Sequence, residues 1–289
     1  MSAVAATPLR QHAPPRAQQR PRHLGRLAIA ALHAELACSP KPGLVTPFSR
    51  GSHQDMDAGT FLRSLFALRG YFTAIAAQAA TSADFAPLRQ LGIQAERGML
   101  AATGNVNTHR GAIFSLGLLV ASAARLHAAG CPSPSADAVC QGVRQWREAL
   151  LQAPLDPGSP GQRARVRHAV PGVREEAAAG FPLLREVGVP VLRAALADGL
   201  PRDAALLQTL MQLVAVTDDL NLLHRGGAEG LTFAQAQARG FLAAGGVRAT
   251  DAPVHMARIC HAFELRRLSP GGSADLLACA LFLLQQEAA

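Results

Sequence analysis

Alanine and leucine supply most of the apolar side chains in this sequence, and that choice constrains the fold more than any other feature. Hydrophobic residues make up 49% of the chain, but aromatic residues make up only 4%. Strands are usually built from β-branched and aromatic residues, whereas alanine and leucine are strong helix formers. The sequence therefore predicts an all-α protein.

Apolar residues recur at helical spacing along most of the chain, and glycine or proline clusters separate the segments. Neither a series of strands nor an internal repeat is evident. We expect one multi-helix globular domain over residues 24–289, with a flexible segment at residues 154–161. The expected helices cover residues 24–38, 57–79, 88–102, 111–127, 135–152, 173–179, 182–198, 202–224, 231–244, 251–267 and 273–287.

Residues 1–23 form a basic, proline-rich tail without apolar periodicity, which we expect to be disordered. Half of the net charge of +8 comes from its four arginines, which are Arg10, Arg16, Arg20 and Arg22. The rest of the chain is only modestly positive, and it lacks the interleaved aromatic residues on which single-strand binders stack bases. We therefore expect no nucleic-acid partner and a cleft that suits a polyphosphate.

The sequence also argues against a membrane or secreted protein. The longest uncharged apolar run covers residues 111–124, whereas a membrane span needs roughly 18–20 residues. The tail lacks the apolar segment of a secretory signal. The five cysteines include no CxxC pair and are typical of buried thiols in a reducing compartment. We expect a cytoplasmic protein that is not bound to a membrane and has no zinc site.

Residues 103–111 (TGNVNTHRG) place a run of polar side chains between two apolar helical patterns. Asn107, Thr108, His109 and Arg110 stand where the second helix begins. The first turn of a helix presents unpaired N–H groups and positive potential, which favour a bound anion. This loop therefore predicts an anion-binding site.

Residues 51–57 hold His53, Asp55 and Asp57 at alternate positions. Two nearby carboxylates can bind Mg²⁺, which usually takes one or two carboxylates together with waters and substrate phosphates. The alternative is that Asp57 caps the next helix while Asp55 is solvated. Taken alone, the segment favours this alternative.

Polar residues continue the apolar face of the helix expected over residues 202–224. Asp218, Asn221 and Arg225 stand at i, i+3 and i+7, so they share one side of that helix. A buried helix whose end enters a cleft would have this pattern. We favour that interpretation over an exposed network of Asp and Arg side chains.

Other charged residues stand where simple helix rules do not fully explain them. Glu35 falls on the apolar stripe of the first helix, where a carboxylate is costly unless it is paired, functional or close to water. Glu96 shares a face with Thr103 and so points toward the polar loop. Helix capping explains the acidic residues near 173–179 but not Arg174. Residues 273–275 have a plain N-cap pattern.

The common motifs of nucleotide-binding proteins and hydrolases are absent. Six other segments occur instead: residues 39–45 (SPKPGLV), 51–57 (GSHQDMD), 103–111, 180–182 (GFP), 219–227 (DLNLLHRGG) and 270–275 (PGGSAD). The ordered set resembles the triphosphoribosyl-dephospho-CoA synthase family, which serves citrate lyase and malonate decarboxylase. The first two segments look closer to the malonate decarboxylase branch.

This resemblance implies an all-α ATP:dephospho-CoA triphosphoribosyltransferase. The ribose 2′-hydroxyl of dephospho-CoA would attack C1′ of the ATP ribose, and adenine would leave while the triphosphate stays on the sugar. The product would be the prosthetic-group precursor of an acyl carrier protein and would pass to an acyl-carrier-protein holo-synthase. The sequence leaves open whether the protein forms a homodimer.

The resemblance also implies roles for the polar residues. The reaction needs a base, an oxocarbenium stabiliser, a proton donor for adenine and cations for the triphosphate. The base or stabiliser would be Glu35 or Glu96, and the proton donor would be His53 or His109. The cofactor Mg²⁺ would be held by Asp55, Asp57, and Asp218 or Asp219, and the phosphate oxygens by Lys41, Arg110 and Arg225. Further substrate-binding candidates are Thr103, Asn107, Thr108, Arg174, Asn221 and Asp275.

Two alternatives belong to other functional classes. An N-glycoside hydrolase that resembles the ADP-ribosylglycohydrolases would also be all-α and rich in carboxylates, but it would use water in place of the hydroxyl. A helical scaffold that binds RNA through its arginine tail would leave the polar clusters unexplained.

Overall fold

The computed structural model describes residues 16–152 and 160–288, and every regular element within these ranges is a helix. The only extended pairing in the described part of the chain is an isolated bridge between Thr46 and Ser49. The all-α prediction is therefore confirmed. Residues 1–15 of the predicted tail and most of the segment 154–161 lie outside the described residues.

Most of the predicted helices occur with bounds that differ by a few residues. The segment 135–152 is divided by a 3-10 turn, and the segment 182–198 begins with a π-helical turn. In chain order the helices are α1 (Arg16–Ala37), α2 (Ala58–Thr81), α3 (Phe85–Thr103), α4 (Arg110–Ala128), α5 (Ala136–Gly142), η1 (Val143–Trp146), α6 (Arg147–Gln152), α7 (Pro160–His168), α8 (Val173–Ala178), η2 (Leu184–Gly188), α9 (Val189–Ala197), α10 (Arg202–Val216), α11 (Leu220–Ala243), η3 (Gly246–Arg248), α12 (Ala252–Leu265) and α13 (Gly271–Glu287).

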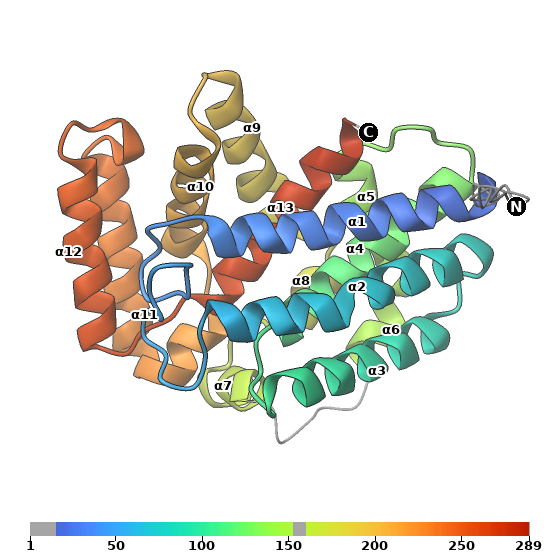
Figure 1. Cartoon of the computed structure of the whole chain (residues 1–289), viewed down its shortest axis with the longest axis horizontal. Coiled ribbons are helices and arrows are strands. Elements are labelled where there is room, and N and C mark those ends of the chain that lie inside the picture. The colour runs from blue at the N-terminus through green and yellow to red at the C-terminus, as the bar shows by residue number, and fades with distance from the viewer. Residues whose placement is uncertain (1–15, 153–159, 289) are drawn as a thin grey trace, which may run out of the picture.

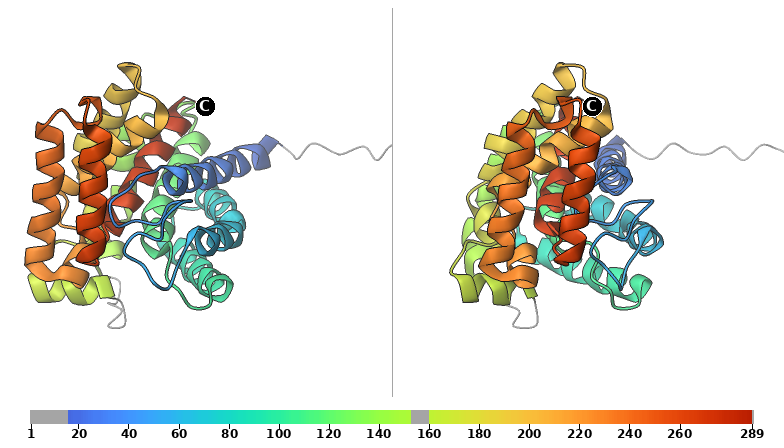
Figure 2. Two further views of the ribbon diagram at one scale, coloured as in Figure 1. Left: turned by 60° about the vertical axis from the view of Figure 1, so that its left-hand side comes forward. Right: turned by 90° about the vertical axis from the view of Figure 1, so that its left-hand side faces the viewer.

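The helices form two groups with α13 between them (Figure 1). In the first group, α2 packs against α1, α3 and α4. The second group contains α9 to α12, and Figure 2 shows α11 and α12 side by side at the edge of the molecule. α13 contacts α1 and α4 in one group and α9 and α10 in the other, and it is apolar almost all round. Such a helix belongs in a core.

α4 is also a core helix. It is the only helix in the described ranges that is long and apolar enough to cross a membrane, and 67% of that stretch is buried inside the protein. The Tyr71 hydroxyl of α2 donates a hydrogen bond of 2.8 Å to the Ile113 carbonyl of α4. This contact needs a glycine at position 117, because a Cβ there would lie 2.1 Å from the Tyr71 oxygen.

The first helix is longer than the sequence predicted. It begins at Arg16 rather than near Leu24, and it includes Pro21, which removes one backbone hydrogen bond. The Arg20 guanidinium donates a hydrogen bond of 3.2 Å to the Pro132 carbonyl. Residues 16–23 have no apolar stripe of their own, so a search for periodicity missed them.

The predicted helix over residues 202–224 is wrong, because the chain breaks after Val216. Asp219 caps a new helix there, and its Oδ1 accepts hydrogen bonds from the N–H groups of Asn221 (2.9 Å) and Leu222 (3.4 Å). An aspartate at this position satisfies N–H groups that a helix start leaves unpaired. The face shared by Asp218, Asn221 and Arg225 therefore does not exist as predicted.

The predicted N-cap of the last helix is also wrong. α13 begins at Gly271, and Ser273 lies inside its first turn. The N–H and hydroxyl of Ser273 both donate to Oδ2 of Asp219, at 2.8 and 3.0 Å. Asp219 therefore joins the start of α11 to the start of α13.

Candidate active site

A cavity of about 910 Å³ lies where α1, α3, α4, α8, the α10–α11 junction and the start of α13 meet. Pockets that bind small molecules are usually of this size. All but three of the predicted site residues line it: Glu35, His53, Asp55, Glu96, Asn107, Thr108, His109, Arg110, Arg174, Asp218, Asp219, Asn221, Arg225 and Asp275. The exceptions are Lys41, Asp57 and Thr103.

The polar loop at residues 103–111 shapes one wall of the cavity. Thr103 is buried, and its hydroxyl contacts the carbonyls of Met99 (2.9 Å) and Val106 (2.6 Å), so it closes the end of α3 instead of reaching a ligand. Oδ1 of Asn107 accepts a hydrogen bond of 3.1 Å from the Arg110 N–H and so caps α4. The start of α4 is thereby held at the cavity, and anion binding there stays a prediction.

Three buried polar atoms on the cavity wall have no hydrogen-bond partner among the described residues. They are Oγ1 of Thr108, Nε2 of His109 and Oγ1 of Thr217. Buried polar groups without a partner are rare, because each one costs desolvation energy. Each atom is almost fully shielded from solvent, so a ligand in the cavity would reach it only after a local rearrangement of the wall.

His109 is an uncharged histidine. It is 3% exposed, and its Nδ1 lies 2.6 Å from the Ser64 hydroxyl. Burial lowers the pKa of His109 to about 3, and the charge of Lys41 contributes to the shift. The imidazole is therefore neutral at physiological pH.

Glu35 and Lys41 form a buried ion pair beneath the cavity. The Lys41 Nζ lies 2.5 Å from Glu35 Oε1 and 2.5 Å from the Glu35 carbonyl oxygen. The two side chains are 9% and 1% exposed, respectively. Glu35 is thus paired inside the protein, and Lys41 faces Glu35 rather than phosphate oxygens in the cavity, which corrects the sequence-based prediction.

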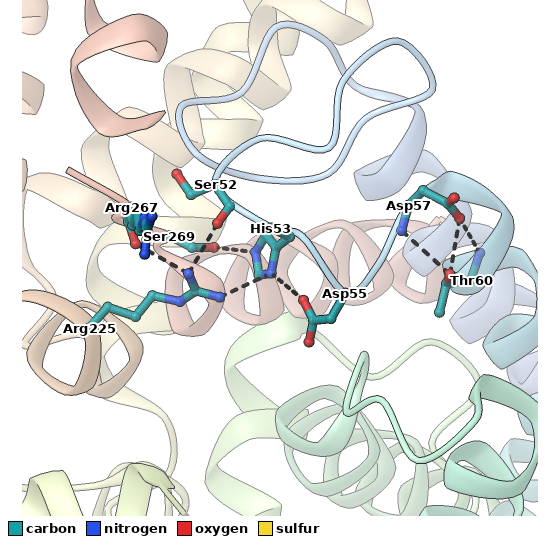
Figure 3. Close-up of polar contacts among 8 residues, drawn as sticks. All are labelled: Ser52, His53, Asp55, Asp57, Thr60, Arg225, Arg267 and Ser269. Atoms are coloured by element: carbon teal, nitrogen blue, oxygen red, sulfur yellow. Dashed lines mark hydrogen bonds and ion pairs between the residues drawn. The ribbon is translucent and has the colours of Figure 1, made fainter. Parts of the chain in front are cut away.

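His53 is held between two connecting segments (Figure 3). The Arg225 guanidinium, which can only donate, lies 3.0 Å from Nδ1, so Nε2 carries the proton and donates to the Ser269 hydroxyl at 2.9 Å. Burial, and then Arg225, lower the pKa of His53 to about 4. Oδ1 of Asp55 lies 3.8 Å from Nδ1. His53 is therefore also neutral and links these segments.

Arg225 reaches across the rim of the cavity. Its Nη1 donates to the carbonyls of Ser52 (3.3 Å) and Arg267 (3.2 Å). Figure 3 shows that these contacts tie the segment around His53 to the connection before α13. Arg225 is exposed and lines the cavity, so it can also approach a ligand.

The predicted metal-ligating carboxylates fall into two classes. Asp57 accepts a hydrogen bond of 2.9 Å from the Thr60 N–H (Figure 3), so it has the capping role that was the alternative to metal binding. It is not among the residues that line the cavity. Asp219 is 1% exposed and its two oxygens are occupied by four protein donors. Neither carboxylate is available to Mg²⁺.

Asp55 and Asp218 are exposed and line the cavity, so they remain available to a cation. No group of three or more His, Cys, Asp or Glu side chains that could hold a metal occurs among the described residues. This donor set fits a magnesium ion that enters with a phosphate ligand, because Mg²⁺ often keeps only one or two carboxylates.

Glu96 and Arg110 connect α3 to the start of α4. Their side chains form an ion pair, and each is 31% exposed. Both line the cavity. The predicted approach of Glu96 to the polar loop is confirmed.

Asp275 lies just after the first turn of α13 and faces the start of α4. It accepts a hydrogen bond from the Ala112 N–H. A Cβ on Gly111 would lie 2.0 Å from Asp275 Oδ2, so the carboxyl group fills the space that a side chain there would take. Burial raises the pKa of Asp275 well above its usual range, and Glu35 and Asp219 contribute to the rise.

Glu176 is a cavity residue that sequence reasoning missed. It accepts a hydrogen bond of 2.7 Å from the Leu183 N–H, and burial raises its pKa to about 7. In the sequence, helix capping accounted for the adjacent pair of acids. Only Glu175 has that role, through its contact with the Gly172 N–H at 2.8 Å.

Comparison with known proteins gives a consistent result. Residues 21–289 match the family described as ATP:dephospho-CoA triphosphoribosyl transferase. A protein of Acinetobacter calcoaceticus is 39% identical over 266 residues, which cover 91% of each chain. One from Citrobacter koseri is 40% identical over 269 residues, covering 90% of this chain and 89% of its own.

A protein of Vibrio cholerae is 37% identical over 270 residues, covering 89% of this chain and 86% of its own. All three relatives are named as probable 2-(5''-triphosphoribosyl)-3'-dephosphocoenzyme-A synthases. No solved structure shows a significant match.

Proposed function

Because the chain belongs to the ATP:dephospho-CoA triphosphoribosyl transferase family, we propose that the cavity between α1, α4, α8, α11 and α13 is its active site. The protein is a transferase with 2-(5''-triphosphoribosyl)-3'-dephospho-CoA synthase activity, and ATP and dephospho-CoA are its substrates. One observation carries the assignment of the site. Cationic side chains and carboxyl groups line the same cavity.

The reaction exchanges one bond at the anomeric carbon of the ATP ribose. The bond from C1′ to N9 of adenine breaks, and a bond from C1′ to the 2′-oxygen of dephospho-CoA forms. Positive charge develops at C1′, so a fixed carboxylate near it would stabilise the transition state. The attacking hydroxyl must lose a proton, and adenine must gain one.

We assign the two catalytic glutamates different tasks. Lys41 and the surrounding helix hold Glu35 in one position, which suits a preorganised charge that stabilises the oxocarbenium ion. Glu96 is partly exposed and can exchange a proton with solvent, which suits the base that receives the hydroxyl proton. Both tasks need a negative charge in the cavity.

The triphosphate would be received at the start of α4. The positive end of the helix and the guanidinium groups of Arg110 and Arg174 supply positive charge and hydrogen-bond donors. Magnesium would enter bound to ATP and take Asp55 and Asp218 as protein ligands, where it would neutralise phosphate charge. Asn221 and Arg225 at the opposite rim would contact the second nucleotide.

A direct test combines the protein with Mg-ATP and dephospho-CoA and measures adenine release and the mass of the product. Product formation that depends on both substrates supports the assignment. Release of adenine or ribose products without dephospho-CoA would favour the N-glycoside hydrolase alternative. Folded Glu96→Gln and Asp55→Asn variants should lose activity, whereas wild-type rates would exclude their assigned roles.

The proposal also covers the metabolic branch, the cellular location and the assembly of the protein. The segments at residues 39–45 and 51–57 favour the malonate decarboxylase branch, with the product delivered to an acyl-carrier-protein holo-synthase. Because both branches need the same product, a decarboxylase or lyase gene next to the coding gene would decide between them. Five free cysteines support a cytoplasmic location. Size-exclusion chromatography with light scattering would test the homodimer.

A further inference from the structure

Three carboxyl groups from three different elements meet at the inner wall of the cavity. Glu35 comes from α1, Asp219 from the cap of α11 and Asp275 from α13. Both of the other carboxylates raise the pKa of Asp275, so the three groups are electrostatically coupled. Three negative charges in one buried region repel each other strongly, and such a cluster keeps a proton.

The surrounding groups show which member keeps the proton. Glu35 has the ammonium group of Lys41 at 2.5 Å. Burial raises the pKa of Asp219, and its four hydrogen bonds from protein donors oppose that rise. Asp275 accepts one hydrogen bond, from the Ala112 N–H, and its other close neighbours among the titrating groups are carboxylates and the Cys279 thiol.

No cation of the described part of the chain is among the groups that shift the pKa of Asp275. Lys41 is already paired with Glu35, and His109 on the adjacent helix start is neutral. Asp275 therefore has the fewest compensating groups of the three, and its burial beside the other carboxyl groups favours its protonated form. A protonated carboxyl group has an O–H that can be donated.

This O–H is accessible from the cavity. Asp275 lines the cavity, and its carboxyl group lies against the backbone of Gly111, where the missing Cβ leaves room for it. The polar loop, Glu35 and the start of α13 surround the same space. An acid in this position can reach a bound substrate without first taking a proton from water.

We propose that Asp275 is the general acid that protonates adenine, a role that rests on the proposed function of the cavity. As the bond from C1′ to N9 breaks, the carboxyl proton passes to N7, and adenine leaves as the neutral 7H tautomer. The new bond from C1′ to the 2′-oxygen forms in the same exchange, and the hydroxyl proton passes to the base carboxylate. That proton returns to Asp275 before the next turnover, so charge and atoms balance.

Methylation of ATP at N7 gives a substrate that separates proton donation from other roles. Its purine is already cationic and leaves as a neutral molecule without an acid. Asp275→Asn keeps a hydrogen-bond donor of similar size but cannot transfer a proton. We expect this variant to release adenine from ATP about 10²–10⁴-fold more slowly than wild type. With N7-methyl-ATP and dephospho-CoA its rate should stay within a few-fold of wild type.

Glu176→Gln is the decisive comparison, because Glu176 also lines the cavity and its pKa is about 7. A loss that N7-methylation rescues in Glu176→Gln but not in Asp275→Asn would overturn the proposal. An equal loss with both substrates in Asp275→Asn would also overturn it and would indicate a structural role. Asp84→Asn, an exposed carboxylate without a capping hydrogen bond, is the matched control.

The wild-type enzyme offers a second test that does not depend on a variant folding. The protonated form of Asp275 is the active one, so kcat/KM for ATP should fall as the pH rises through the pKa of the acid. This fall in kcat/KM should be absent with N7-methyl-ATP. A fall with both substrates would refute the role of Asp275 as the acid. A wild-type protein that releases no adenine from ATP with dephospho-CoA would refute the proposed function itself.

Discussion

Replacing Lys41 with methionine should destabilise the protein far more than removal of an ordinary surface lysine. The ammonium group lies 2.5 Å from a Glu35 carboxylate oxygen, and the two side chains are 1% and 9% exposed. Methionine is close to lysine in volume, so the packing is kept while the charge and its donors are lost. A carboxylate is then left inside the protein without its partner.

The expected cost follows from this burial. Breaking a buried ion pair by removing one partner costs about 3–5 kcal/mol, against a total stability of roughly 5–15 kcal/mol for a typical domain. Arg50→Met is the matched control, because Arg50 pairs with Asp57 at 3.2 Å but the two side chains are 61% and 43% exposed. An exposed pair of this kind contributes little to stability, because solvent and salt screen the attraction between its charges.

Urea denaturation of wild type, Lys41→Met, Glu35→Gln and the double variant completes a mutant cycle. We expect the double variant to be more stable than the sum of the two single losses predicts, because it leaves no unpaired charge. Additive losses, or a cost for Lys41→Met as small as that for Arg50→Met, would refute the reasoning. If Lys41 instead bound phosphate, a stable Lys41→Met variant would mainly show a higher KM for ATP.

Three further predictions concern neighbouring positions. Gly111→Ala should unfold more easily because its Cβ would lie 2.0 Å from Asp275 Oδ2, whereas Gly98→Ala, with nothing within 4 Å, should be neutral or stabilising in thermal melts. Arg225→Gln should raise the pKa of His53 above its value of about 4, which NMR titration of the ring protons would detect, and an unchanged value would contradict the contact. Folding raises the pKa of Asp275, so the wild-type protein loses stability as the pH rises above the pKa that this group has in the unfolded chain. The stability of Asp275→Asn relative to wild type, measured by urea denaturation, should therefore increase toward neutral pH.

Helix periodicity predicted most of the fold because the core faces of these helices are made of alanine and leucine. The break between α10 and α11 was missed because no glycine or proline marks it. The side chain of Asp219 caps the new helix instead. Hydrogen bonds from Ser273, which lies 54 residues later in the chain, hold that side chain in place. A contact between residues so far apart cannot be inferred from local spacing.

Residue chemistry predicted which side chains gather around the cavity better than it predicted their partners. Residues 107–111 of the polar loop and Glu35 line the cavity, and all of them break an apolar pattern in the sequence. The sequence could not show that Lys41 turns back to Glu35 or that Asp57 caps α2. It also hid Glu176, because an acid in a first helical turn has an ordinary explanation.

The carboxyl groups of the cavity are chemically similar, and their neighbours make them different. A lysine pairs with Glu35, and four donors hold Asp219 as part of the framework. Burial, and then repulsion from both, favour the protonated form of Asp275. Equivalent amide substitutions should therefore fail in different ways. Glu35→Gln should slow the reaction with ATP and N7-methyl-ATP alike, because it removes charge from the transition state of both. Asp275→Asn should slow only the reaction whose leaving group needs a proton.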